Sequence, residues 1–206
     1  MKLNCLITGV GGQGTILASK MLAQTAILKK EYAQTSETIG MAQRGGSVVS
    51  HVRIGDKAAS PNIPFHGADM IIGFEPAEAV RNLNLLKPNG TCIVSSKGIR
   101  PVTASLSGVS YNPTEMITFL KAHTGNLIVI DGEALCEKLG NSKALNMILL
   151  GAALGSGHLP FTKEDLINTL HTYLPERFWA VNERAIEMGM SESLSLTQNI
   201  GGACHE

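Results

Sequence analysis

The sequence has little charge and few aromatic residues. Of its 206 residues 17% are charged and 4% are aromatic, and 17 Lys and Arg balance 17 Asp and Glu. A chain with no excess of positive charge lacks the basic face that general nucleic-acid binding requires, so we expect no nucleic-acid partner. Hydrophobic residues reach 44%. This composition fits a compact protein with a plain surface, or a subunit whose surface is partly buried against a partner.

Long apolar runs are also absent. The longest, residues 144–154, is interrupted by Asn146 and Gly151, and it is shorter than the roughly 20 residues of a membrane span. The first residues reach the glycines that begin at Gly9 before an apolar signal region can form,. We therefore expect a cytoplasmic protein with no signal peptide and no membrane contact.

Grouped metal ligands are missing as well. The four cysteines (Cys5, Cys92, Cys136 and Cys204) are scattered, without a Cys-x-x-Cys pair, and the six histidines have no ligand spacing. Iron–sulfur clusters and zinc ribbons need clustered thiolates. The chain also lacks a P-loop, a G-x-S-x-G elbow and an H-E-x-x-H motif,. We expect no metal site and no catalytic residue, so the chain does not resemble a complete enzyme.

What is present is an alternation of strand and helix patterns. Strands are predicted at 3–8, 32–35, 47–54, 70–72, 91–94 and 127–130, and helices at 15–28, 76–86, 113 onward, 132–140, 142–155, 163 onward and 181–190,. A polar, glycine-ended tail follows the last helix, and Pro88-Asn89-Gly90 reads as a helix stop. Asn112, Asp131, Asn141 and Thr162 are the predicted helix caps,. This order predicts one α/β domain over residues 1–206, with three Rossmann-like layers, a largely parallel sheet and helices on both faces.

A glycine loop, Gly9-Val10-Gly11-Gly12-Gln13-Gly14, joins the first strand to the first helix. Its G-x-G-x-x-G spacing permits a tight turn, close approach of a ligand, and an anion at the helix N-terminus. The candidate cofactor-binding residues are Gly9, Gly11, Gly12, Gly14 and Thr15. The alternative is a turn that serves only helix–sheet packing. An NAD site needs an acid about 20 residues further on, and Glu37, predicted in a loop, is a poor match.

A second cluster runs from Ser36 to Gly46 and is predicted to be a long shaped loop that leads into the strand at 47–54,. Arg44 precedes two glycines, which suits recognition of an anion or a carbonyl group; the alternative is an arginine at a subunit interface. The candidate substrate or interface residues are Ser36, Glu37, Arg44, Gly45 and Gly46.

Together the two clusters resemble the gamma-type domain of 2-oxoacid:ferredoxin oxidoreductases. The run Gly-Met-Ala-Gln-Arg-Gly-Gly at 40–46 is more similar to the small (beta) subunits of the indolepyruvate enzymes than to the pyruvate enzymes. The resemblance extends through Ala68-Asp69, Glu75-Pro76 and residues 146–152, and so covers most of the chain.

The resemblance implies a subunit of an enzyme that decarboxylates a 2-oxoacid, indolepyruvate or another aryl pyruvate. The reaction takes place on thiamine diphosphate, electrons pass through iron–sulfur clusters to ferredoxin, and coenzyme A captures the acyl group. Thiamine and clusters are implied in a larger partner subunit, and coenzyme A can be expected at the glycine loop. The isolated chain is expected to be inactive and can form a homodimer. Two alternatives stay open: a stand-alone enzyme that binds NAD or ATP, and a purely structural partner subunit.

Overall fold

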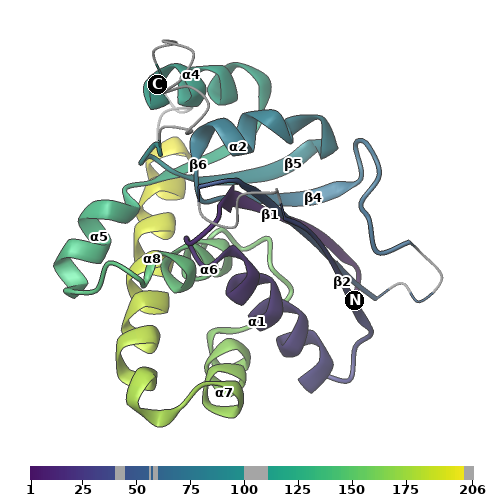
Figure 1. Cartoon of the computed structure of the whole chain (residues 1–206), viewed down its shortest axis with the longest axis vertical. Coiled ribbons are helices and arrows are strands. Elements are labelled where there is room, and N and C mark those ends of the chain that lie inside the picture. Colours follow the sequence, from purple (N-terminus) through teal and green to yellow (C-terminus); the bar gives the residue numbers. More distant parts are fainter. Residues whose placement is uncertain (40–44, 56, 58–59, 100–110, 202–206) are drawn as a thin grey trace.

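A six-stranded sheet lies between two layers of helices (Figure 1). This arrangement comes from a computed structural model, which describes residues 1–39, 45–55, 57, 60–99 and 111–201. The strand order is β2-β3-β1-β4-β5-β6. The strands are β1 (Leu3–Val10), β2 (Ala33–Ile39), β3 (Ser47–Ile54), β4 (Ala68–Gly73), β5 (Leu86–Ser95) and β6 (Asn126–Ile130).

The sheet is mostly parallel, as the sequence predicts, and β3 is the exception. Strands β1, β4, β5 and β6 pair in parallel, whereas β3 runs antiparallel to both β1 and β2. Only residues 40–46 connect β2 to β3, and a connection this short cannot make the crossover that a parallel pair needs. Strands β2 and β3 are therefore antiparallel, and in the observed strand order β3 lies between β1 and β2.

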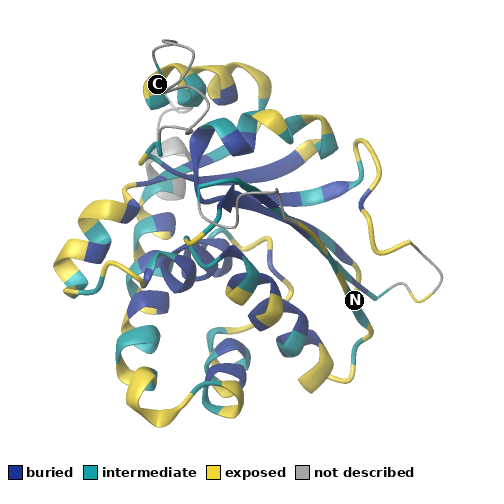
Figure 2. Cartoon of the chain, in the orientation of Figure 1, coloured by how far each residue is buried: buried dark blue, intermediate teal, exposed yellow. Residues whose placement is uncertain are grey.

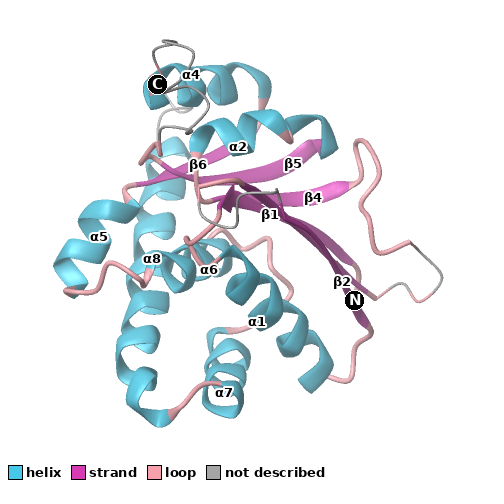
Figure 3. Cartoon of the chain, viewed as in Figure 1, coloured by secondary structure: helices cyan, strands magenta, loops and turns pink. Residues whose placement is uncertain are grey.

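Helices cover both faces of the sheet, which confirms the expected fold class (Figure 3). On one side lie α1 (Thr15–Leu28), α5 (Gly132–Leu139), α6 (Leu145–Gly155), α7 (Lys163–Tyr173) and α8 (Trp179–Gly201); on the other lie α2 (Pro76–Arg81) and α4 (Pro113–His123). Although α8 has 23 residues, no helix in the described part of the chain has the length and apolarity that a membrane crossing requires.

The central strands are buried on both faces (Figure 2). In β1, Cys5 and Ile7 pack into the core under α1 and α6, while Leu6 between them packs into the core under α2 and α4. Successive side chains of a strand point to opposite faces. A strand covered on both faces therefore reads as a continuous apolar run, which is the pattern of residues 3–8.

Three predicted helix caps are confirmed. Asn112 accepts a hydrogen bond from the Thr114 amide at 3.0 Å, and Asp131 accepts one from the Ala134 amide at 3.0 Å. Thr162 forms a reciprocal capping box with Asp165 at the start of α7. Each cap satisfies an N–H group that has no partner within its helix.

Asn141 does not cap α6. Its side chain accepts from the Lys143 amide at 2.9 Å and so closes a turn, and α6 begins at Leu145 with Ala144 as its first flanking residue. The next helix in the chain thus starts three residues later than the cap pattern predicts, because the asparagine stabilises the turn that precedes the helix.

Two predicted boundaries are also wrong. Helix α8 does not end near Met190 but continues to Gly201, so the expected polar tail is helical up to that residue. Helix α2 ends at Arg81 and is followed by a short 3-10 turn, Leu83–Leu85, after which Pro88–Gly90 lie within β5. The pairing of β5 with β4 shifts in this stretch, from Ala68 opposite Leu86 to Met70 opposite Thr91. Such an irregularity tolerates a proline.

Helices α6 and α8 cross with their backbones in contact. A Cβ atom on Gly151 would lie less than 3.0 Å from the Ile186 backbone, and one on Gly189 would lie equally close to the backbone of Ile148. Only glycine fits at either position. The first turn of α6 lies beside the glycine loop, where a Cβ on Gly14 would meet the Asn146 side chain.

Candidate functional site at the carboxyl edge of the sheet

The glycine loop joins β1 to α1, and its glycines are required for different structural reasons. A Cβ on Gly9 would lie less than 3.0 Å from Phe74 and Gln13, so Gly9 is needed for packing. Gly12 and Gly14 have φ angles of +104° and +87°, which side-chain-bearing residues adopt at a cost. A Cβ on Gly12 would have no atom of the described residues within 4 Å. Gly12 therefore leaves open space at the end of the sheet.

The N-terminus of α1 has no side-chain cap. Gly14 occupies the cap position, no side chain among the described residues caps the first turn, and that turn contains no acidic residue. The first N–H groups of a helix carry partial positive charge. The geometry therefore suits an anion next to Gly12, Gly14 and Thr15.

Gln13 closes the gap between β1 and β4. Its Oε1 accepts from the Val10 amide at 2.7 Å, and its Nε2 donates to the Phe74 carbonyl at 3.0 Å. After β1 the chain enters α1 on one face of the sheet, and after β4 it enters α2 on the other. Such a switch point is where open α/β sheets place ligands. Through these two hydrogen bonds the Gln13 amide links the glycine loop to Phe74 at the end of β4.

The second glycine-rich cluster pairs with the first. The Gly11 amide donates to the Gly46 carbonyl at 2.8 Å, and the Gly45 amide donates to the Gly11 carbonyl at 3.3 Å. Gly45 has a φ of +80°. The structure thus brings Gly45 and Gly46 to the glycine loop, whereas Arg44 lies outside the described residues.

Ser36 and Glu37 are not in a loop but in β2, so their predicted setting is wrong. They pair with His51 and Ser50 of β3, and Glu37 also accepts a hydrogen bond from the Ser19 hydroxyl of α1 at 3.2 Å. In a dinucleotide fold the ribose-binding acid follows the strand next to β1. Here β3 separates β2 from β1, so Glu37 is not placed as that acid.

Two buried carboxylates at the end of β4 were not singled out as functional by the sequence. Glu75 accepts hydrogen bonds from the Glu78 amide at 3.0 Å, from the Ile99 amide at 3.4 Å and from the Tyr111 hydroxyl. Glu78 accepts from Ser47 at 2.6 Å and Arg81 at 2.5 Å. Burial, and then the neighbouring Glu75, raise the pKa of the Tyr111 phenol. Both carboxylates are thus held by hydrogen bonds from the protein itself. Glu75 caps the start of α2, and Glu78 links α2 to Ser47 at the start of β3.

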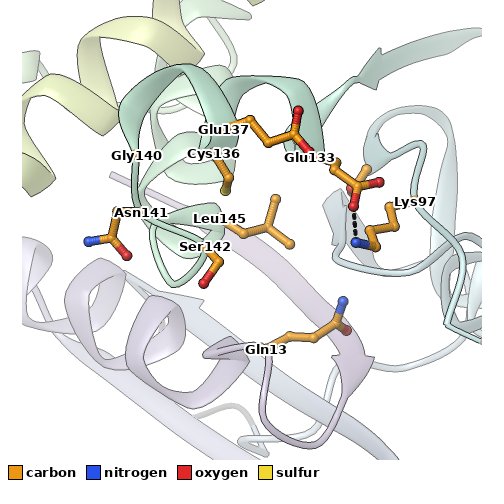
Figure 4. Close-up of a pocket in the computed structure, with 11 residues that line it drawn as sticks. Gln13, Lys97, Glu133, Cys136, Glu137, Gly140, Asn141, Ser142 and Leu145 are labelled. Atoms are coloured by element: carbon orange, nitrogen blue, oxygen red, sulfur yellow. Dashed lines mark hydrogen bonds and ion pairs between the residues drawn. The ribbon is translucent and has the colours of Figure 1, made fainter.

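A pocket of about 390 Å³ adjoins the glycine loop on the side of β5 and β6 (Figure 4). It is lined by Gln13, Ser95, Lys97, Gly132, Glu133, Cys136, Glu137, Gly140, Asn141, Ser142 and Leu145. Sequence analysis named Gln13, Cys136 and Asn141 only as parts of other features. The signal that could have found the pocket is the position of its residues after two neighbouring parallel strands, where ligands bind in α/β sheets.

The described residues do not fit an iron–sulfur cluster. Cys5, Cys92 and Cys136 are each buried alone, and no group of three or more His, Cys, Asp or Glu side chains in the described part of the chain could hold a metal ion. Burial raises the pKa of all three thiols, that of Cys92 to about 12. Cluster ligands are thiolates.

Comparison with known proteins decides the family. The sequence model of the family described as pyruvate ferredoxin/flavodoxin oxidoreductase matches residues 4–192. The chain belongs to this family. The resemblance found in the sequence is thereby confirmed.

Curated relatives of this oxidoreductase-family chain match over nearly their whole length. It is 36% identical to the indolepyruvate oxidoreductase subunit IorB of Archaeoglobus fulgidus, covering 95% of this chain and 97% of the relative. The IorB of Methanothermobacter thermautotrophicus is also 36% identical, with 92% and 96% covered. The pyruvate/ketoisovalerate oxidoreductases common subunit gamma of Thermococcus kodakarensis is 25% identical, with 90% and 94% covered.

Solved structures share the fold. The gamma subunit of a keto/oxoacid ferredoxin oxidoreductase from Geobacter sulfurreducens superposes with a TM-score of 0.68 at 22% identity, covering 94% of this chain and 99% of that one. The 2-oxoglutarate:ferredoxin oxidoreductase from Magnetococcus marinus gives 0.71 at 16% identity, where 94% of this chain covers 31% of the larger one. The α/β architecture is therefore that of the family's gamma-type domain.

Proposed function

We propose that the chain is the small subunit of an enzyme that oxidatively decarboxylates an aryl 2-oxoacid such as indolepyruvate and transfers electrons to ferredoxin. The observation that carries the proposal is the difference in similarity between two groups of relatives. Four chains named IorB are 33–36% identical over at least 91% of this chain. Chains named as the common gamma subunit of pyruvate and ketoisovalerate enzymes are 25% identical.

In this proposal the redox cofactors belong to a larger partner subunit. That assignment is supported by the described cysteines, which are single and buried and so offer no cluster ligands. The partner holds thiamine diphosphate and the iron–sulfur clusters, and the small subunit supplies surfaces that bind, orient and exclude water. Ferredoxin contacts the assembled complex.

We assign the glycine loop to coenzyme A. The uncapped start of α1 and the open space at Gly12 suit the diphosphate of that substrate,. The residues of this site are Gly9, Gly11, Gly12, Gly14 and Thr15. Gly45 and Gly46, hydrogen-bonded to the same loop, together with Arg44 form the contact with the substrate or the partner subunit. Ser36 and Glu37 are left out of this site because they lie on β2.

The test is reconstitution. We expect the purified chain alone to be colourless and inactive, and the complex co-expressed with a thiamine- and cluster-bearing large subunit to reduce ferredoxin with indolepyruvate and coenzyme A. Turnover with indolepyruvate should exceed turnover with pyruvate. Activity of the isolated chain, or a complex that prefers pyruvate, would contradict the proposal. Binding of NAD or ATP to the isolated chain would instead favour a stand-alone nucleotide enzyme.

A further inference from the structure

Strand β2 ends the sheet on one side, and its outer edge has no strand partner in the described part of the chain. The free N–H and C=O groups of such an edge are a template for another strand, which soluble proteins commonly block with lysine, proline or a bulge. The sequence of β2 is Ala-Gln-Thr-Ser-Glu-Thr-Ile, without lysine or proline, and its pairing with β3 is continuous from Ala33 to Ile39. Strand β2 therefore lacks the usual protection against pairing with a further strand.

Helix α1, which packs over β2 and β3 (Figure 1), exposes apolar side chains. Leu17, Ile27 and Leu28 are 36%, 46% and 45% exposed. Together with Lys20 and Gln24 they recur at the three- and four-residue intervals that form one face of a helix,. The other faces of α1 are buried and apolar as well. A helix with apolar residues all round is normally covered all round, so we expect this exposed stripe to be covered in the working protein.

The stripe faces the outer edge of β2. Successive residues of a helix are about 100° apart. Ile27 is therefore about 200° around α1 from Thr25, which donates to Thr169 of α7, and only about 80° from Ser19, which donates to Glu37 of β2,. This side of α1 thus turns away from α7 and toward β2, and the stripe and the strand edge form one continuous surface.

We propose that this surface, the outer edge of β2 with the exposed stripe of α1, pairs with the same surface of a second copy of the chain. A two-fold axis makes one patch its own partner, and β2 can run antiparallel to its copy so that the two sheets join. With the axis at Ser36, the middle residue of β2, Glu37 lies opposite Thr35 and not opposite the second Glu37. The edge and the stripe each carry one charged residue, Glu37 and Lys20, so the paired surfaces are balanced in charge.

The size of the surface fits a dimer that forms reversibly. Strand β2 has seven residues and α1 has 14, which correspond to lengths of about 24 Å and about 21 Å. Side by side they offer roughly 400–500 Å² on each copy, so that a dimer buries roughly 1,000 Å² in total, at the lower end of specific interfaces. Because a two-fold contact of this kind closes on itself, we expect a dimer and no larger assembly.

The test is sedimentation equilibrium of the purified full chain over a range of concentrations. We expect a monomer–dimer equilibrium in which Leu28→Glu and Thr38→Lys each raise the dissociation constant about tenfold or more, because each brings like charges together across the axis. Leu194→Glu on α8, where the leucine is 41% exposed, and Thr118→Lys on α4 are the matched controls and should leave dimerisation unchanged. Thermal melting of each variant checks that it is folded.

Hydrogen exchange identifies the contact itself. Peptides from β2 should exchange more slowly in the dimer than in the Leu28→Glu chain, because pairing protects the amides of the outer edge. A wild-type chain that stays monomeric at the highest concentrations would overturn the proposal, and so would a dimer that both surface variants leave intact. If the variants instead weaken only assembly with the large subunit, the surface belongs to that partner and the proposal is wrong. These measurements use no substrate, so their outcome is independent of the proposed reaction.

Discussion

Substitutions in the glycine loop can distinguish a loss of stability from a loss of coenzyme A binding. Gly12 has a φ of +104°, and a Cβ added there would meet no atom within 4 Å in the part of the chain that the structure describes. Gly157, before α7, has a φ of +73° and equally open surroundings. Gly12→Ala and Gly12→Val, and the same changes at Gly157, therefore introduce backbone strain of the same kind without any internal clash.

The strain sets the expected loss of stability. A side-chain-bearing residue in the left-handed region costs about 1–2 kcal/mol, and the reduced freedom of the unfolded chain returns about 0.4–1 kcal/mol. A net loss near 1 kcal/mol lowers the thermal midpoint of a chain of this size by about 2–4 °C. We expect this shift at both positions, with valine worse than alanine at each.

Function should distinguish the two sites. If coenzyme A lies over Gly12, Gly12→Val raises its KM in the reconstituted complex about tenfold or more, Gly12→Ala raises it less, and both Gly157 variants leave it unchanged. The assay is ferredoxin reduction at varied coenzyme A beside thermal melting of each chain. The assignment of coenzyme A is refuted if the Gly12 variants melt lower but keep the wild-type KM. Weaker assembly with the large subunit at an unchanged KM would show that the loop seats the partner.

Three further predictions concern the fold. Gly151→Ala should lower the free energy of unfolding in urea by about 2 kcal/mol, because overlap with the α8 backbone outweighs the gain in helix propensity,; Gly125→Ala, where a Cβ meets nothing, should change it by less than about 0.5 kcal/mol. Burial lowers the pKa of His51, whose Nδ1 accepts from the Ile63 amide at 3.1 Å. The unfolded chain thus binds this proton more readily, so the free energy of unfolding should fall as pH drops below about 6.5, and less so in His51→Gln. The Cys136 thiol, with its raised pKa, should react with iodoacetamide at pH 7 far more slowly in the native than in the unfolded chain, as peptide mass spectrometry would show.

Local chemistry made much of this fold predictable. The bounds of α1 and β3 agree with the sequence patterns, and Asn112, Asp131 and Thr162 act as caps in the structure. These features depend on residues within a few positions of one another, such as a side-chain oxygen two or three residues before an amide.

Features that depend on distant partners were less predictable. The polar stretch at 36–39 has little strand character of its own and becomes part of β2 because it pairs with β3. The second half of α8 lacks the regular apolar stripe from which a helix is predicted,. The contact of Gly151 and Gly189 across two helices has no local signature either, because each glycine is explained only by the backbone opposite it.

The candidate site divides in the same way. The G-x-G-x-x-G spacing identifies the glycine loop because the loop is continuous in the sequence. The pocket draws Gln13 from the first βα turn, Ser95 and Lys97 from the end of β5, and Glu133 and Leu145 from beyond β6. Nothing in the sequence places these segments together except the strand order β1-β4-β5-β6, which the sequence does not reveal.

Gln13 connects the two parts of the edge. Its amide holds the glycine loop to β4 through Val10 and Phe74, and the same side chain lines the pocket. With both amide atoms bonded to backbone, Gln13 acts as a fixed wall. A ligand in the pocket and an anion at α1 would therefore share one rigid boundary, each on its own side. The backbone of Gly11 is also hydrogen-bonded to Gly45 and Gly46. A displacement of the glycine loop would therefore displace this second glycine-rich segment as well. Hydrogen bonds thus join three separate stretches of sequence at this edge, namely the glycine loop, Gly45–Gly46 and Phe74.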